Sequence, residues 1–213
     1  MNGGGAVMII IHVPVSYGTT NCYIICDEGK KECAVVDPGG DAPKIAKAVE
    51  ESGCESKAIL LTHGHYDHIG GLKGLRETWS GVPVYLNERD IIHSDDKKTA
   101  RLFPDAGETV NYDEGDVIAV GGLGIKVMAT PGHTPGGVSL IVEDALFCGD
   151  TLFASSMGRT DLPGGSEDEI MNSLARLGRL EGNYTVYPGH MKASDLDTER
   201  LVNGYLIKAM EKK

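Results

Sequence analysis

Three of the chain's seven histidines lie within six residues of one another, in the stretch LLTHGHYDHIGG. They are His63, His65 and His68, with Asp67 placed between the second and the third. The stretch directly follows an apolar run and directly precedes two glycines. On a regular helix or strand these four side chains could not all converge on one point, but on a sharp loop at a strand end they can. The glycines would then allow the following helix to approach closely.

Residues of the same ligand types recur where other apolar runs end. MATPGHTPGG delivers His133, ALFCGDTLF delivers Asp150, YTVYPGH delivers His190 and AVVDPGG delivers Asp37. A single aspartate or histidine at a strand end is common, but packing alone does not explain ligand-type residues at so many strand ends. We therefore expect these strand ends to meet and to hold metal ions. His12 and His93 match no such pattern and are expected to be structural or surface residues.

Runs rich in Val and Ile, bounded by Gly, Pro or Asp, predict strands. Runs of this kind followed by a helical pattern occur twice, before and after about residue 110, which predicts two sheet-plus-helix halves with helices outside. Helices are expected at 41–53, at 166–178 and near the C-terminus. The last should carry one apolar stripe formed by Leu201, Val202, Tyr205, Leu206 and Ala209. Residues 88–112 show no clear period and are expected to be a mobile or helical insertion.

Charge and cysteine content narrow the class of protein. The net charge of −11 argues against a nucleic-acid or anionic-membrane partner. No apolar stretch reaches membrane-spanning length, and the glycine-rich start lacks the basic segment of a signal peptide. Five cysteines without a C-x-x-C pair indicate free thiols in a reducing cytosol, so we expect a cytoplasmic protein. The oligomeric state is left open.

THGHYDHIGG resembles the H-x-H-x-D-H signature of the metallo-β-lactamase superfamily, and His133, Asp150 and His190 match its later motifs. The resemblance runs from TNCYII to YPGH. It is closest to the glyoxalase II (hydroxyacylglutathione hydrolase) branch, whose small bacterial members carry a segment similar to GDTLFASSMGRTDLPGGS. It implies an α/β protein with an αββα sandwich of two mixed β-sheets and helices on the outer faces, in agreement with the two predicted halves.

The resemblance also implies a set of metal ligands. His63, His65 and His133 would hold the first ion, Asp67, His68 and His190 the second, and Asp150 would bridge them. Asp37 would lie outside this set and orient a histidine ligand or its loop. Two divalent ions are therefore expected. Zinc is the first expectation, and iron and manganese stay open because imidazole and carboxylate ligands suit all three.

The activity implied is hydrolysis of a hydroxyacyl thioester by a metal-bridging hydroxide, with Asp67 and Asp150 as the catalytic carboxylates. Arg159 and Lys192 are candidates for binding a small-molecule thioester substrate. Larger glyoxalase II enzymes add a C-terminal helical domain for glutathione. This chain has only about one helix beyond its last motif, and Lys192 replaces an aromatic residue of those enzymes. We expect a single domain over residues 1–213 without a separate glutathione-binding domain, so the thiol carrier is open.

Two other classes of function compete with this interpretation. A persulfide dioxygenase would use one Fe(II) held by His63, His133 and Asp150, and related persulfide dioxygenases carry a segment similar to GRTD. A non-enzymatic binding module is least favoured, because such a protein should have lost ligands and this chain keeps all seven. Hydrolysis of another ester, a lactone or a β-lactam stays possible within the same chemistry.

Overall fold

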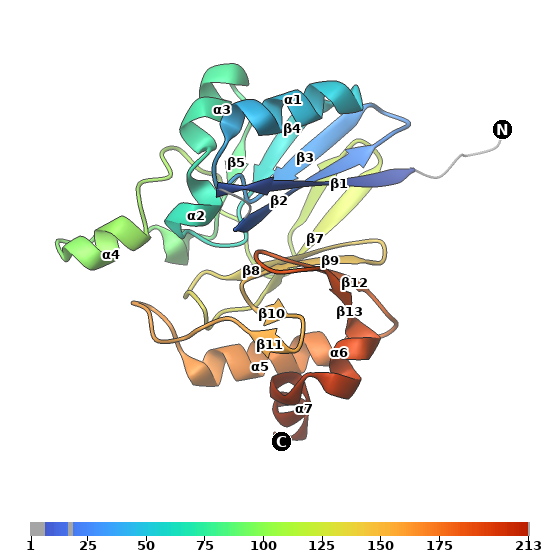
Figure 1. Ribbon diagram of the computed structural model, residues 1–213. Helices are drawn as coiled ribbons and strands as arrows, with labels where there is room; N and C mark the ends of the chain where they lie inside the picture. The colour runs from blue at the N-terminus through green and yellow to red at the C-terminus, as the bar shows by residue number, and fades with distance from the viewer. Residues whose placement is uncertain (1–6, 17–18, 213) are drawn as a thin grey trace.

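The first half of the chain forms a five-stranded mixed sheet (Figure 1). The structure is a computed structural model that describes residues 7–16 and 19–212, so the glycine-rich start considered above lies outside the described residues. The strands lie in the order β1 (Met8–Val15), β2 (Thr20–Asp27), β3 (Glu32–Val36), β4 (Glu55–Leu60) and β5 (Val84–Tyr85). β1, β2 and β3 pair antiparallel, whereas β3, β4 and β5 run parallel.

The second half forms a six-stranded mixed sheet. Its order is β13 (Ser194–Asp195), β12 (Thr185–Pro188), β9 (Ala145–Gly149), β8 (Val138–Val142), β7 (Leu123–Ala129) and β6 (Val117–Val120). β12 and β9 run parallel, and the other neighbours pair antiparallel. A small hairpin of β10 (Leu152–Phe153) and β11 (Ser156–Met157) follows β9.

Helices cover the outer face of each sheet. The first sheet carries α1 (Ala42–Ser52), α2 (Tyr66–Ile69) and α3 (Leu72–Thr78), and the second carries α5 (Glu167–Gly178), α6 (Leu196–Val202) and α7 (Gly204–Glu211). Figure 1 shows the two sheets face to face in the middle, with α1 and α3 above and α5 to α7 below. The expected αββα sandwich of two mixed sheets is therefore confirmed.

Alternation along the strands explains the layers. In β2, Cys22 and Ile24 pack in the cluster that includes residues of α1 and α3, while Tyr23 and Ile25 pack in the cluster between the sheets. A third cluster lies between the second sheet and α5, α6 and α7. Both sheets are thus buried on two faces, which makes them a firm base for the loops at their strand ends.

The expected single stripe on the C-terminal helix is wrong. The helix is interrupted at Asn203, whose side-chain Oδ1 accepts the backbone N–H groups of Tyr205 and Leu206 at the start of α7. Leu206 stays buried, but Leu201 is 78% exposed and Val202 is also exposed. The amide cap starts a new helix in a new direction, and the apolar period read from the sequence does not continue across it.

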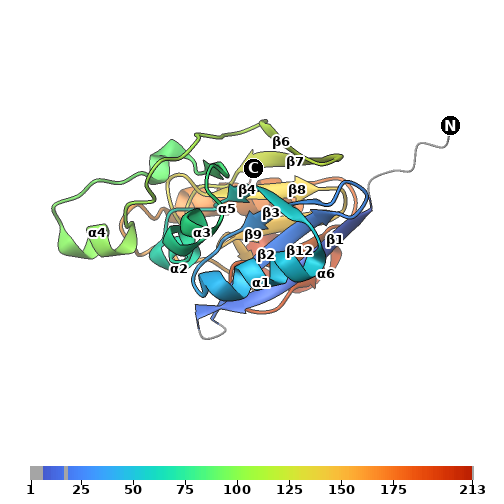
Figure 2. The same ribbon diagram turned by 90° about the horizontal axis from the view of Figure 1, so that it is seen from above.

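Residues 88–112, expected to be a mobile or helical insertion, are partly helical. They contain the short 3-10 helix η2 (Glu88–Asp90) and the helix α4 (Lys97–Leu102). Figure 2 shows α4 at one end of the molecule. Directly after α4, the buried ring of Phe103 lies 4.7 Å from the ring of His65. Val110 then pairs with Tyr85, which returns the chain to the first sheet.

All five cysteines are free thiols, and four of them are buried. Over residues 7–16 and 19–212, no helix combines the length and apolar character needed to cross a bilayer.

Candidate metal centre

The seven ligand candidates lie together where strands of both sheets end. His63 and His65 stand in the loop after β4, Asp67 and His68 in the first turn of α2, His133 in the loop after β7, Asp150 directly after β9 and His190 just after β12. Both sheets therefore contribute to one site.

These side chains form two groups with Asp150 between them. The ligand atoms of His63, His65 and His133 lie within 4.8 Å of one another, and those of Asp67, His68 and His190 do the same. Asp150 Oδ1 is 3.5 Å from His68 Nε2, and Oδ2 is 3.4 Å from both His133 Nε2 and His190 Nε2. The geometry brings together the two sets that the resemblance implies.

In four of the histidines, the ring nitrogen Nδ1 lies within hydrogen-bond distance of an oxygen atom. Nδ1 of His63 faces Thr62 Oγ1 at 3.1 Å, that of His68 faces Asp37 Oδ2 at 2.9 Å, that of His133 faces the Arg159 carbonyl at 2.8 Å, and that of His190 faces the Thr19 carbonyl. A carbonyl or carboxylate oxygen can only accept, so Nδ1 of His68, His133 and His190 carries a proton, and Nε2 is left as the nitrogen that can bind a metal ion. This arrangement is typical of histidines that bind metals.

Some atoms of the candidate ligand side chains lack a hydrogen-bond partner in the described part of the chain. They are His63 Nε2, His65 Nε2 and Asp150 Oδ1, all of them buried. A buried polar atom without a partner is costly. Nitrogen and carboxylate donors in this arrangement suit divalent cations such as zinc, iron or manganese. The residues present therefore fit a pair of divalent ions.

The two groups differ in their electrostatics. Burial, reinforced by His68 and the other imidazoles, holds the pKa of His63 well below its usual value, and burial with His133 lowers the pKa of His65 to about 3. Burial would also lower the pKa of His190, but Asp150 and Asp67 outweigh it and raise that pKa to about 11. His63 and His65 are thus neutral and ready to coordinate, whereas His190 must release a proton before it can bind a metal ion.

Asp37 and Thr62 support both groups from behind. Asp37 accepts hydrogen bonds from the Thr62 backbone N–H at 2.7 Å, from the Thr62 hydroxyl at 2.6 Å and from His68 at 2.9 Å. Because the Thr62 hydroxyl donates to Asp37, its oxygen is free to accept from His63. Thr62 was missed in the sequence, since a threonine at a strand end carries no pattern of its own.

A second missed residue, Asn21, holds the loop of His190. Its backbone N–H donates to Gly189 O at 2.8 Å, and its side-chain amide donates to Pro188 O at 2.9 Å and Met191 O at 2.8 Å. The signal available was a buried asparagine at the start of a strand, inside TNCYII. His12 is exposed but touches this arrangement, with Nε2 2.8 Å from Asn21 Oδ1. His93 is exposed and belongs to neither group.

A pocket of about 440 Å³ opens onto the candidate ligands. The rest of its lining is mostly apolar and includes Tyr66, Leu102, Phe153, Met157, Leu162 and Met191. Arg159 also lines it, but its guanidinium makes two 2.6 Å hydrogen bonds to the carboxylate of Asp161. Lys192 is exposed and lies outside this lining. Of the two expected substrate contacts, the structure places only Arg159 at the pocket.

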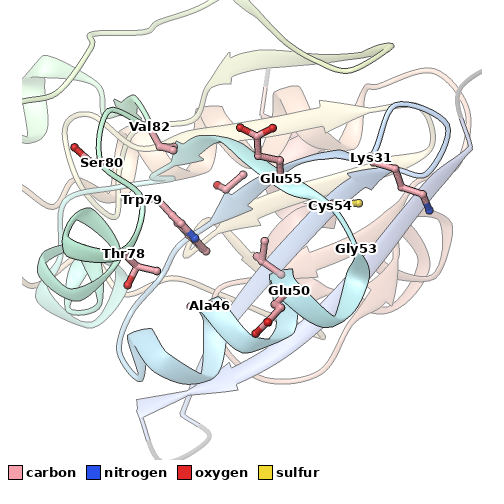
Figure 3. A pocket seen from close by; sticks show the side chains of 12 residues that line it. Lys31, Ala46, Glu50, Gly53, Cys54, Glu55, Thr78, Trp79, Ser80 and Val82 are labelled. Carbon is pink, nitrogen blue, oxygen red and sulfur yellow. The ribbon is translucent and has the colours of Figure 1, made fainter.

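A larger pocket of about 520 Å³ lies elsewhere, between α1 and the chain that follows α3. Figure 3 shows Trp79, Glu50 and Lys31 around it. It contains charges of both signs and none of the seven ligand candidates. The ligand candidates therefore lie at the smaller pocket and not at this one.

Comparison with known proteins gives the same result. The profile of the Metallo-beta-lactamase superfamily matches residues 16–190, which include all seven ligand candidates. The probable metallo-hydrolase YqgX of Bacillus subtilis is 35% identical over 91% of this chain and 95% of its own. The hydroxyacylglutathione hydrolase GloC of Haemophilus influenzae is 31% identical over 91% of this chain and 96% of its own.

A solved structure is similar over the same span. TTHA1623, crystallised in a di-iron-bound form, superposes with a TM-score of 0.80 at 31% identity, covering 92% of this chain and 99% of its own. The two mixed sheets, the clustered histidines and aspartates, and the profile match over residues 16–190 all lead to the same family. The chain belongs to the metallo-β-lactamase superfamily.

Proposed function

We propose that the chain is a metal-dependent hydrolase of small thioesters, with hydroxyacyl thioesters as the first substrates to test. The observation that carries this proposal is the convergence of Nε2 of His68, His133 and His190 on the Asp150 carboxylate, which itself lines the 440 Å³ pocket. Divalent ions bound there would polarise a carbonyl oxygen and lower the pKa of water. Zinc is the first metal to test, and the di-iron form of TTHA1623 makes iron the second.

Asp67 and Asp150 would have different tasks. Asp150 lies between the two groups and is almost fully buried. Asp67 is more exposed and lines the pocket, with Oδ2 3.2 Å from His190 Nε2. Burial would raise the pKa of Asp67, but the hydrogen bond with His190 and the charge of His68 hold it well below its usual value. Asp67 therefore stays ionised and can accept a hydrogen bond from a water molecule in the pocket.

The apolar walls would bind the rest of the substrate. Phe153 and Met157 on the small hairpin and Leu102 at the end of α4 face the pocket beside the ligand candidates. Such walls remove water from around a bound thioester and favour its apolar parts. The 31% identical hydroxyacylglutathione hydrolase GloC supports this substrate class.

The experiment is metal counting together with a substrate panel. The protein is stripped of metal, reloaded anaerobically with zinc, iron or manganese, and assayed with S-lactoylglutathione, simpler thioesters, lactones and glutathione persulfide. Two ions per chain and thioester hydrolysis without oxygen would support the proposal. One iron per chain with oxygen consumption on the persulfide would reject it in favour of the dioxygenase.

A further inference from the structure

Asp90 is a buried carboxylate at the end of η2, with only 3% of its surface exposed. No lysine or arginine within the described ranges pairs with it. Instead, Oδ2 accepts hydrogen bonds from Gly64 N and Thr134 Oγ1, both at 2.8 Å, and Oδ1 accepts from Gly136 N at 2.5 Å. Burying an ionised carboxylate is costly, so a site that satisfies it with three donors calls for an explanation.

The three donors belong to the two loops that carry the three-histidine group. Gly64 stands between His63 and His65, and Thr134 directly follows His133. The first loop leaves β4 of the five-stranded sheet, and the second leaves β7 of the six-stranded sheet. One carboxylate therefore joins the two sheets at the point where these histidines face each other, with His65 Nδ1 2.9 Å from His133 Nε2.

The backbone around Asp90 is built for this contact. A Cβ atom on Gly136 would lie 2.7 Å from Asp90 Oδ1, and one on Gly64 would lie 2.8 Å from the Asp90 carbonyl oxygen. Neither distance is tolerated by real side chains, so both loops must carry glycine to reach the carboxylate. Asp90 itself is not among the ligand groups.

We propose that Asp90 is a positioning residue, which sets the distance between the His63–His65 loop and the His133 loop and so tunes metal affinity at the three-histidine group. The second group is held by different residues, Asp37 and Asn21. Asp90 should therefore act on one metal site and spare the other. This role rests on the metal site of the proposed function but not on its substrate.

The test uses the substitution Asp90→Asn, which keeps the shape of the side chain. One oxygen becomes an NH₂ group, so in either orientation of the amide one backbone N–H loses its acceptor. Apoprotein is titrated with Co²⁺ or Zn²⁺ against a competing chelator. The variants His133→Ala and His190→Ala assign each equivalent to its group. We expect binding at the three-histidine group to weaken by about 10- to 100-fold, the usual effect of residues behind metal ligands, with the other group nearly unchanged.

A second pair of variants guards against misfolding of Asp90→Asn. Thr134→Val removes one of the three donors and should weaken the same equivalent by a smaller factor. Thr134→Ser keeps the hydroxyl and should restore binding. A purely structural role of Asp90 would not predict a site-selective loss that serine rescues.

Asp27 supplies the matched control at the opposite end of β2 from Asn21. It is also buried, and its carboxylate accepts three backbone N–H groups, from Gly29, Lys30 and Gly122. Asp27→Asn should lower the melting temperature of the apoprotein but leave both metal affinities unchanged.

Three results would overturn the role of Asp90. These are unchanged binding of both equivalents in Asp90→Asn, equal loss at both groups, or the same selective loss in Asp27→Asn. A wild-type protein that binds no metal would overturn the proposed function itself, whereas two tightly bound ions in both wild type and Asp90→Asn would remove only this inference.

Discussion

The Asp37 carboxylate accepts a hydrogen bond from Nδ1 of His68 at 2.9 Å, and both side chains are almost completely buried. The same carboxylate binds the hydroxyl of Thr62, which in turn faces Nδ1 of His63. One residue outside the candidate ligand set thus fixes the ring orientation of a histidine in each group. Because the rings are held before any ion arrives, less order has to be created on binding.

We expect Asp37→Asn to weaken metal binding by about 10- to 100-fold. In one orientation of the amide, His68 and the Thr62 hydroxyl lose their acceptor, and in the other the Thr62 backbone N–H loses its acceptor. Chelator competition on the apoprotein measures the loss. Asp41→Asn is the matched control. The Asp41 carboxylate lies in the same loop, and among the described residues it accepts a hydrogen bond only from the backbone of Ser16. Unchanged affinity in Asp37→Asn would show that the ring of His68 is held by packing instead.

Asp150→Ala should remove most activity and lower metal content at both groups. Its two oxygens lie 3.4–3.5 Å from Nε2 of His68, His133 and His190, so no other side chain can take its place between them. Metal analysis of the purified variant and steady-state kinetics check this. Full metal content with normal turnover would exclude Asp150 from the site.

Gly39→Ala should disturb the second group without changing any ligand side chain. A Cβ atom at Gly39 would lie 1.7 Å from the backbone oxygen of Asp67, so the first turn of α2 has to move. Overpacking of this kind typically costs about 1–3 kcal/mol of stability. We expect a lower melting temperature and weaker binding of the equivalent assigned to Asp67, His68 and His190.

Gly204→Ala is the control for that experiment. The position opens α7 and has no atom within 4 Å of an added Cβ, so alanine should be neutral or slightly stabilising. If Gly39→Ala behaves like Gly204→Ala, the close approach of the loop to α2 does not matter for the site.

The positions of the ligand-type residues at strand ends could be predicted from the sequence because the pattern is local. An apolar run followed by aspartate or histidine can be read without knowing which strands are neighbours, and the resemblance then groups the residues. Asp90 follows the short run PVYL in the same way, but its partners are two backbone N–H groups and a hydroxyl from other loops. Contacts with the backbone do not depend on a recognisable residue type. Asp90 also lies in a segment without a clear period, so the sequence did not reveal its role.

Asn203 and Arg159 also make side-chain contacts that the sequence pattern alone does not decide. The apolar period of the C-terminal segment predicts one helix, but the side chain of Asn203 caps a new one, and such a cap overrides the period. Arg159 was predicted as a candidate contact for a substrate carboxylate, with a structural pair to Asp161 as an equal alternative. Its guanidinium is already paired with Asp161, two positions along the chain. Side-chain pairing of this kind depends on the local turn, which the sequence does not specify.

Arg159 also allows a direct test of how the pocket recognises its substrate. The pair with Asp161 is exposed, and exposed ion pairs contribute little, so a substrate carboxylate can compete for the guanidinium. Arg159→Ala should raise KM for S-lactoylglutathione on the order of tenfold, the effect of losing one charge-assisted contact. Metal content should not change, because His133 is held by the backbone carbonyl of Arg159, which the substitution keeps.

Asp161→Asn and a thioester with a truncated carrier test whether Arg159 binds a carboxylate of the substrate. Asp161→Asn frees the guanidinium and should lower KM for the same substrate, opposite in sign to Arg159→Ala. With a thioester whose carrier lacks a carboxylate, neither substitution should change KM, because the apolar walls of the pocket then provide the binding. Steady-state kinetics of both variants on both substrates decide between the two kinds of contact. If wild type saturates at low micromolar S-lactoylglutathione and Arg159→Ala does the same, Arg159 serves its own loop, and the grip on the carrier must come from the apolar residues around Leu102 and Met157.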